Sequence, residues 1–121
     1  MQPRRDTGQW ALPGGAQELG ETIAECAVRE CREETGVDVA VTGILGVYSD
    51  PRHIVEYSDG EVRQEYEVTL VGRPIGGEPT INEEASDVRW VHPDDLGVLD
   101  IHPTMRRQID HYLAGQYPHV D

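Results

Sequence analysis

Three glutamates within five residues are the part of this sequence best suited to chemistry. Glu30, Glu33 and Glu34 occur in the segment RECREE, residues 29–34. Carboxylates three and four residues apart on a helix lie close together and repel each other, so the cluster destabilises a helix on its own. Mg²⁺ prefers hard oxygen ligands and would cancel this repulsion. The alternative is an acidic helix face exposed to solvent.

The residues around the cluster predict a helix over residues 22–35. Thr22 followed by Glu25 is a capping-box pattern, and Gly36 can adopt the left-handed conformation that ends many helices. At about 100° per residue, the three glutamates share an arc of roughly 100°. This arc borders an apolar arc that we expect to pack on a sheet, formed by Ala24, Ala27, Val28 and Cys31.

Two glycines and a further glutamate precede the predicted helix. Gly14 and Gly15 have no side chains, so a carbonyl of their backbone can approach an ion beside the helix. Glu21 stands just before the helix, where the helix dipole favours a carboxylate. The loop can therefore add a backbone carbonyl to the predicted metal site.

The rest of the chain predicts strands that alternate with helices, which is typical of an α+β domain. Thr42-Gly43 is expected to separate two strands, and alternation of apolar and polar residues predicts a half-buried strand over residues 62–72. Trp10 and Trp90 are expected in the core. The expected elements are strands at 9–12, 37–41, 44–49, 62–72 and 87–91, a loop at 73–86, a helical turn from 93 and a helix over about 104–113.

Composition and charge limit the possible functions. The 121 residues, 37% hydrophobic and 27% charged, fit one globular domain over residues 1–121. A net charge of −13 repels phosphates, so we expect no nucleic-acid partner. All ten basic residues are arginine, so a direct side-chain contact to a phosphate would use a guanidinium group.

Neither a membrane span nor a secretory leader is expected. No apolar run approaches about 18 residues, and the first ten residues, MQPRRDTGQW, lack the apolar centre of a signal peptide. Cys26 and Cys31 lie five residues apart in the predicted helix, where they point about 140° from each other and do not suit a disulfide. We therefore expect a reduced, cytoplasmic protein without a membrane partner.

These motifs resemble the Nudix box of the Nudix hydrolases. The pattern is Gly15, five residues, Glu21, seven residues, and then RECREETGV, which ends at Val37. WALPGG before it and EEASDVRWV after it are also similar to the family. The resemblance implies the Nudix fold, in which a mixed β-sheet is sandwiched between helices (α/β/α). The chain has few residues before WALPGG, so we expect an N-terminally truncated domain apparently short of its first strand, with a homodimer as one way to complete the edge.

The resemblance also implies an activity. Nudix enzymes hydrolyse a pyrophosphate bond in a nucleoside diphosphate linked to a moiety X, with Mg²⁺, or Mn²⁺ as a substitute, as the cofactor. By this resemblance Glu30, Glu33 and Glu34 would bind the metal together with the carbonyl of Gly14 or Gly15.

Further roles follow from the same resemblance. Glu84 would supply another metal ligand or the general base, and Glu83 is the alternative. Glu30 is a second candidate for orienting or deprotonating the attacking water. Arg29 would hold a box glutamate in position, and Glu21 would support the geometry of the loop and helix.

The sequence does not identify X. Weaker candidates for substrate contacts are Arg5, Arg52, Arg63 and Tyr48, and either Tyr48 or Tyr57 could stack on a base. The small-molecule substrate is expected to derive from a nucleoside di- or triphosphate. The alternative function is a catalytically inactive Nudix-fold module that binds a nucleotide as a sensor.

Overall fold

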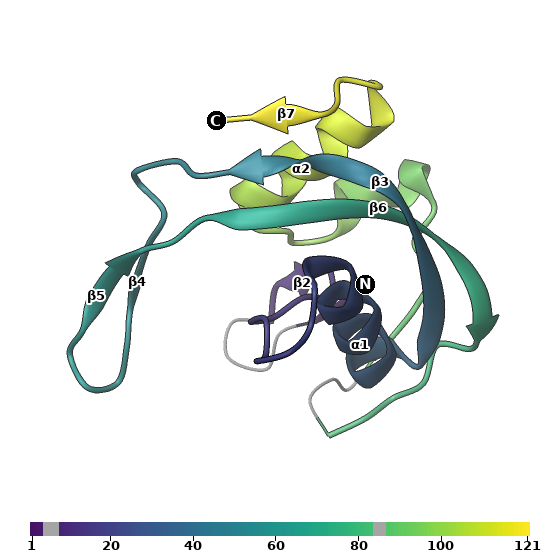
Figure 1. Ribbon diagram of the computed structural model, residues 1–121. Coiled ribbons are helices and arrows are strands. Elements are labelled where there is room, and N and C mark those ends of the chain that lie inside the picture. The colour runs from purple at the N-terminus through teal and green to yellow at the C-terminus, as the bar shows by residue number, and fades with distance from the viewer. Residues whose placement is uncertain (4–7, 84–86) are drawn as a thin grey trace.

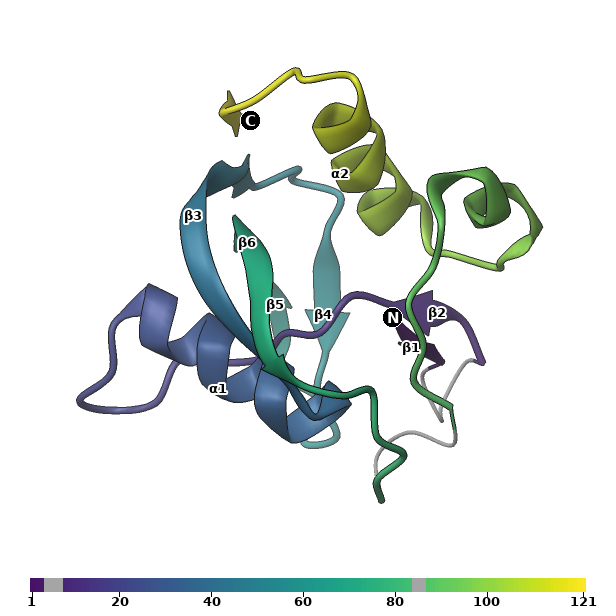
Figure 2. The ribbon, with the colours of Figure 1, turned by 90° about the vertical axis from the view of Figure 1, so that its right-hand side faces the viewer.

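A mixed sheet between two helices forms the body of the protein (Figure 1). The computed structural model describes residues 1–3, 8–83 and 87–121. The sheet has the order β6-β3-β7, with β3 (Val37–Tyr48) antiparallel to β6 (Glu67–Gly77) and parallel to β7 (His119–Val120). Helix α1 (Ile23–Thr35) and helix α2 (Pro103–Leu113) lie on opposite sides of this sheet (Figures 1 and 2). The predicted α+β class with a sheet between helices is confirmed.

Helix α1 begins and ends where the sequence predicts. Thr22 is the N-cap, and its side chain accepts a hydrogen bond from the Glu25 backbone N–H at 3.1 Å. The Glu25 carboxylate accepts from the Thr22 N–H, also at 3.1 Å, which completes the capping box. Gly36 has φ 79°, the left-handed conformation that ends the helix.

Strand β3 is one continuous strand, so the prediction of two strands separated by Thr42-Gly43 was wrong. The register with β6 shifts between Val41 and Gly43, which makes these residues an irregularity within the strand. The expected loop at 73–86 was also wrong in its first part, because β6 continues to Gly77 opposite Val37.

Two small antiparallel sheets complete the strands. Strands β4 (Ile54–Glu56) and β5 (Val62–Gln64) form a hairpin that projects from the body (Figure 1). The predicted strand over 62–72 is therefore divided between β5 and β6. At the N-terminus, β1 (Gln2–Pro3), which the sequence did not predict, pairs with β2 (Trp10–Ala11).

The last third of the chain contains two helices. The 3-10 helix η1 (Pro93–Val98) and α2 are found at their predicted positions. The strand expected at 87–91 is irregular, and Trp90 is 64% exposed rather than in the core. The core contains Ala11, Cys26, Val37, Leu45, Tyr48 and Ile101. No helix in the described ranges has the length and apolar character needed to cross a membrane.

Candidate active site along helix α1

Arg29 connects the box glutamates to the loop before the helix. Its Nε and Nη2 atoms donate to the two carboxylate oxygens of Glu21 at 2.9 and 2.8 Å. Its Nη1 atom donates to Glu30 at 2.9 Å and to Glu33 at 3.1 Å. Nη2 also donates to the carbonyl of Ala16 at 3.2 Å. One guanidinium therefore holds two box carboxylates and two points of the loop.

The charges of this cluster perturb its ionisable groups. The hydrogen bonds from Arg29, supported by the backbone N–H of Glu18, lower the pKa of Glu21 to about 2. The hydrogen bond to Glu21 in turn raises the pKa of Arg29. Burial raises the pKa of the nearby Cys26 thiol, which therefore stays protonated and is no candidate nucleophile.

Two box carboxylates contact the two glycines of the loop. The Glu34 carboxylate accepts a hydrogen bond from the Gly14 backbone N–H at 2.7 Å. The Glu30 carboxylate packs against Gly15 so closely that a Cβ atom on Gly15 would overlap it. Glycine at position 15 is thus required by the position of Glu30, whose side chain is only 15% exposed. The loop covers Glu30, which therefore does not lie on an open ridge as the helical wheel suggested.

Glu33 differs from its two neighbours because its side chain is 58% exposed. As the side chains stand, no three His, Cys, Asp or Glu residues in the described ranges form a group that could hold a metal ion. Glu33 is directed to Arg29, and Glu34 to Gly14. The site residues that we predicted at Glu84 and Arg5 lie outside the described residues, and Glu83 is exposed.

The chemistry of these residues fits a divalent cation. Glu30, Glu33 and Glu34 offer hard oxygen donors within five residues of one helix, which is the ligand type that Mg²⁺ and Mn²⁺ prefer. The backbone of Gly15 packs against the Glu30 carboxylate, and a larger residue at this position would displace Glu30.

The segment before Glu84 is bonded to the end of α1, a connection that sequence reasoning missed. The side chain of Asn82 donates to the backbone carbonyl of Glu34 at 2.6 Å. The Thr80 backbone N–H donates to the carbonyl of Thr35 at 2.8 Å. No pattern in the sequence pairs residues 80–82 with 34–35, yet these bonds bring the chain that leads to Glu84 to the helix that carries the box.

The weaker substrate candidates lie apart from this cluster. Arg52 is paired with Asp50 at 2.7 Å, and Arg63 with Glu61 at 2.8 Å. Tyr48 is only 4% exposed, and its hydroxyl is 2.8 Å from a ring nitrogen of His111 on α2. The expectation that Tyr48 contacts the substrate was wrong, because burial between β3 and α2 leaves its ring no face for a ligand.

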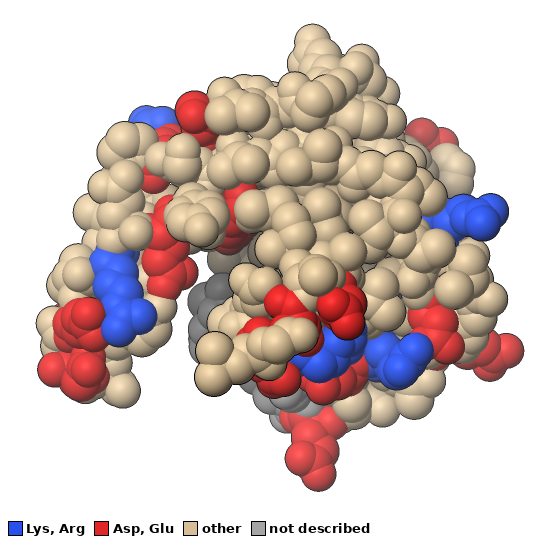
Figure 3. All heavy atoms as spheres, in the orientation of Figure 1, with Lys and Arg blue, Asp and Glu red and all other residues tan. Residues whose placement is uncertain are grey.

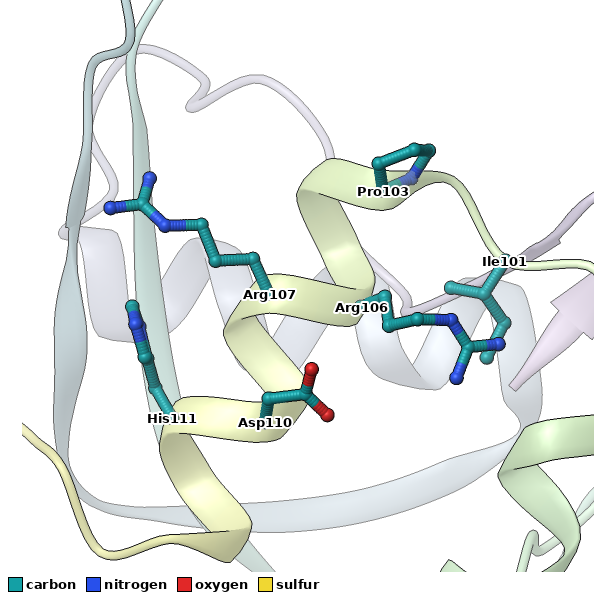
Figure 4. A pocket seen from close by; sticks show the side chains of 6 residues that line it. All are labelled: Ile101, Pro103, Arg106, Arg107, Asp110 and His111. Atoms are coloured by element: carbon teal, nitrogen blue, oxygen red, sulfur yellow. The ribbon is translucent and has the colours of Figure 1, made fainter.

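Among the described residues, one hollow on the surface borders the box and another lies along α2. A hollow of about 580 Å³ runs along α1 and includes Glu21, Arg29 and Glu33 in its wall. The other, of about 450 Å³, lies along α2, where Arg107 and His111 extend from one side of the helix and Arg106 extends towards Ile101 (Figure 4). Its arginines are already bonded, Arg106 to two backbone carbonyls and Arg107 to Asp121, so we place the site at α1.

Several known proteins are similar to this chain. A family model described as "NUDIX domain" matches residues 1–112. A protein named nucleoside triphosphatase NudI from Escherichia coli is 38% identical over 105 residues, which cover 84% of this chain and 74% of that protein. The protein of the same name from Enterobacter sp. is 36% identical over 102 residues, covering 82% of this chain and 72% of that protein.

Two solved structures share the fold at lower identity. An ADP-ribose pyrophosphatase from Streptococcus suis superposes with a TM-score of 0.72 over 99% of this chain and 84% of its own, at 22% identity. A UDP-X diphosphatase superposes with a TM-score of 0.69 over 93% of this chain, also at 22% identity. This chain spans about half the length of the UDP-X diphosphatase, 54%.

Proposed function

The chain belongs to the NUDIX domain family, and from this membership together with its site we propose that it is a Mg²⁺-dependent pyrophosphohydrolase. The proposed substrate is a nucleoside diphosphate linked to a further group X. Water attacks one phosphorus of the pyrophosphate, the bridging P–O bond breaks, and the products are a nucleoside monophosphate and P–X. When X is phosphate, the substrate is a nucleoside triphosphate and the second product is pyrophosphate.

One observation carries this proposal. The carboxylates of Glu30 and Glu34 contact the Gly15 and Gly14 backbone, while Arg29 holds Glu30 and Glu33. An acidic helix face exposed to solvent has no need of a glycine packed on its carboxylates. The arrangement supports a site in which glutamate oxygens and a loop carbonyl bind a cation.

Glu30, Glu33, Glu34 and the carbonyl of Gly14 or Gly15 would hold the metal. Bound there, a divalent cation neutralises pyrophosphate oxygens and lowers the pKa of water. Glu84, or Glu30, would accept the proton of the attacking water.

Arg29 and Glu21 act as positioning residues in this proposal. The bidentate pair fixes the guanidinium on the loop, so Arg29 can fix the carboxylate of Glu30. The names of the bacterial relatives support a nucleoside triphosphate as the first substrate to test. The absence of an apolar helix in the described ranges is compatible with the proposed cytoplasmic location.

The test is hydrolysis of a panel of nucleoside triphosphates, nucleotide sugars, ADP-ribose and dinucleotide polyphosphates. Each compound is incubated with Mg²⁺, with Mn²⁺ or with a chelator, and the products are separated by ion-exchange chromatography. We expect metal-dependent release of a nucleoside monophosphate from at least one class. Binding of nucleotides without turnover of any compound would contradict the proposal and favour a nucleotide-binding sensor.

A further inference from the structure

The β4–β5 hairpin exposes side chains that a folded protein normally covers. Its two strands pair only with each other among the described strands, and an isolated two-stranded hairpin is marginally stable in water. Ile54 and Val62 are each 59% exposed, Tyr57 is 36% exposed, and Tyr66 just beyond the hairpin is 70% exposed. The register places Ile54 and Val62 on one face of the hairpin, and Val55 and Arg63 on the other. Both faces therefore expose side chains that are available for binding.

The hairpin faces the segment that carries the site glycines. Figure 1 shows the chain that connects β2 to α1 between helix α1 and the hairpin. Figure 3 shows a hollow between the hairpin and the rest of the molecule. A molecule held by the box glutamates and long enough to cross this hollow would contact the hairpin.

One face of the hairpin already contains a stacked pair. Arg63 is opposite Val55 in the register, and its guanidinium carbon lies 4.7 Å from the centre of the Tyr57 ring. Hydrogen bonds from Arg63 to Glu61, at 2.9 and 2.8 Å, and from the Tyr57 hydroxyl to Glu65 hold the pair in place. The planar surfaces of tyrosine and arginine are those on which nucleobases stack in proteins.

The charge of the hairpin favours a base over a phosphate or a second copy of the chain. Residues 54–65 contain four acidic residues and one arginine. The carboxylates repel phosphates and accept hydrogen bonds from amino and hydroxyl groups, which a nucleoside carries and a phosphate chain does not. Two copies that met through this hairpin would bring like charges together, and each chain carries a net charge of −13.

We propose that Tyr57 and Arg63 form the platform on which the nucleobase of the substrate stacks, while its phosphates reach the box glutamates. This inference rests on the proposed function, because it names the part of that substrate which lies beyond the phosphates. Tyr57 supplies the aromatic face, and Arg63 supplies a cation above it. The carboxylates around the pair direct the phosphates away from the hairpin.

The test compares binding and turnover in Tyr57→Leu, Tyr57→Phe and Arg63→Ala variants, with Arg73→Ala as the control. Arg73 is an exposed arginine on β6, opposite Ala40 and outside the hairpin. Calorimetry measures the affinity for a non-hydrolysable nucleoside triphosphate with Mg²⁺. Since stacking on an aromatic residue contributes about 1–3 kcal/mol per base, we expect Tyr57→Leu and Arg63→Ala to weaken binding about tenfold or more. Tyr57→Phe and Arg73→Ala should retain the wild-type affinity.

Two further measurements separate the platform from a structural role. With a nucleoside triphosphate, KM should rise in Tyr57→Leu while kcat stays within about twofold, and inhibition by inorganic tripolyphosphate, which has no base, should not change. Light scattering after gel filtration reports the oligomeric state. Unchanged nucleotide affinity in Tyr57→Leu and Arg63→Ala contradicts the platform, as does a wild-type dimer that Val62→Ser dissociates while nucleotide affinity is retained.

Failure of this inference differs from failure of the proposed function. Nucleotide binding that depends on Tyr57 and Arg63, without hydrolysis, would refute the activity and support the platform. Hydrolysis at the wild-type rate and affinity in the Tyr57→Leu and Arg63→Ala variants would support the activity and refute the platform. A wild-type protein that binds no nucleotide would contradict both.

Discussion

The backbone N–H of Gly14 donates a hydrogen bond to the carboxylate of Glu34 at 2.7 Å, which joins the loop before α1 to the last turn of that helix. Together with the packing of Gly15 against Glu30, this bond makes loop and helix one unit. The position of each box carboxylate therefore depends on the loop as well as on the helix.

Gly15→Ala should reduce activity with little effect on folding. The added Cβ would overlap the carboxylate of Glu30, which is the flexible end of a side chain and can move away. A displaced ligand costs about tenfold or more in kcat, by analogy with changes around metal sites. The check is kcat together with the melting temperature. Gly97→Ala, where nothing lies within 4 Å of the added Cβ, is the control. Full activity in Gly15→Ala would show that the contact with Glu30 is not needed.

Arg29→Ala should reduce kcat about 10- to 100-fold, the usual effect of removing a partner that orients metal ligands. The substitution leaves Glu21, Glu30 and Glu33 without their shared cation. Arg29→Lys should recover only part of the activity. The guanidinium of Arg29 bonds both carboxylate oxygens of Glu21 and also Glu30, and the ammonium of lysine cannot reproduce this planar geometry. Arg32→Ala is the matched control, because Arg32 lies on the same helix and pairs with Asp38. Equal losses in Arg29→Ala and Arg32→Ala would refute the assigned role.

Glu21→Gln should make the stability of the folded protein less dependent on pH in the acidic range. Arg29 holds the pKa of Glu21 at about 2 in the folded protein, against an ordinary value of 4.5. The folded state therefore binds fewer protons than the unfolded state between these values. The stability that Glu21 contributes is complete above about pH 4.5 and is lost as the pH falls towards 2. Melting temperatures across this range should fall less steeply in the variant, which should also melt lower at neutral pH. If the melting temperatures of wild type and variant fell in parallel with pH, the ion pair between Glu21 and Arg29 would be contradicted.

Thr22→Ala should destabilise the protein by about 1 kcal/mol, the typical effect of removing an N-cap side chain. The Thr22 hydroxyl accepts from the Glu25 N–H, and α1 carries all three box glutamates. Urea unfolding measures the change. Ser58→Ala is the control, since Ser58 is exposed in the turn of the β4–β5 hairpin and a surface change of this kind stays within about 0.5 kcal/mol.

The helix and its cluster could be predicted because their signals are local. Thr22, Glu25 and Gly36 lie within or beside α1, and their conformations follow from neighbours along the chain. The strands depended on distant partners. Thr42-Gly43 has the composition of a turn, but pairing with β6 carries β3 through it as an irregularity. Residues 73–77 read as a loop and became strand because β3 is long enough to pair with them.

The details of the site could not be predicted from the sequence, because they also depend on residues that are distant along the chain. A helical wheel places Glu30 and Glu33 on one arc, but it does not show that the loop covers Glu30 and leaves Glu33 exposed. Tyr48 looked available for stacking because its burial depends on α2, whose His111 lies 63 positions along the chain. Asn82 carried no signal, since its bond to the Glu34 carbonyl requires a chain reversal that no motif marks.

The most direct test of the central claim is the Mg²⁺-dependent hydrolysis of the best substrate by Glu33→Gln and Glu34→Gln variants. Each substitution keeps the size of the side chain and removes the charge that a cation requires. We predict a loss in kcat of roughly a hundredfold or more for both, while Glu78→Gln, an exposed glutamate outside the site, keeps wild-type activity. Wild-type rates in both box variants would contradict the assignment of these glutamates to the metal site.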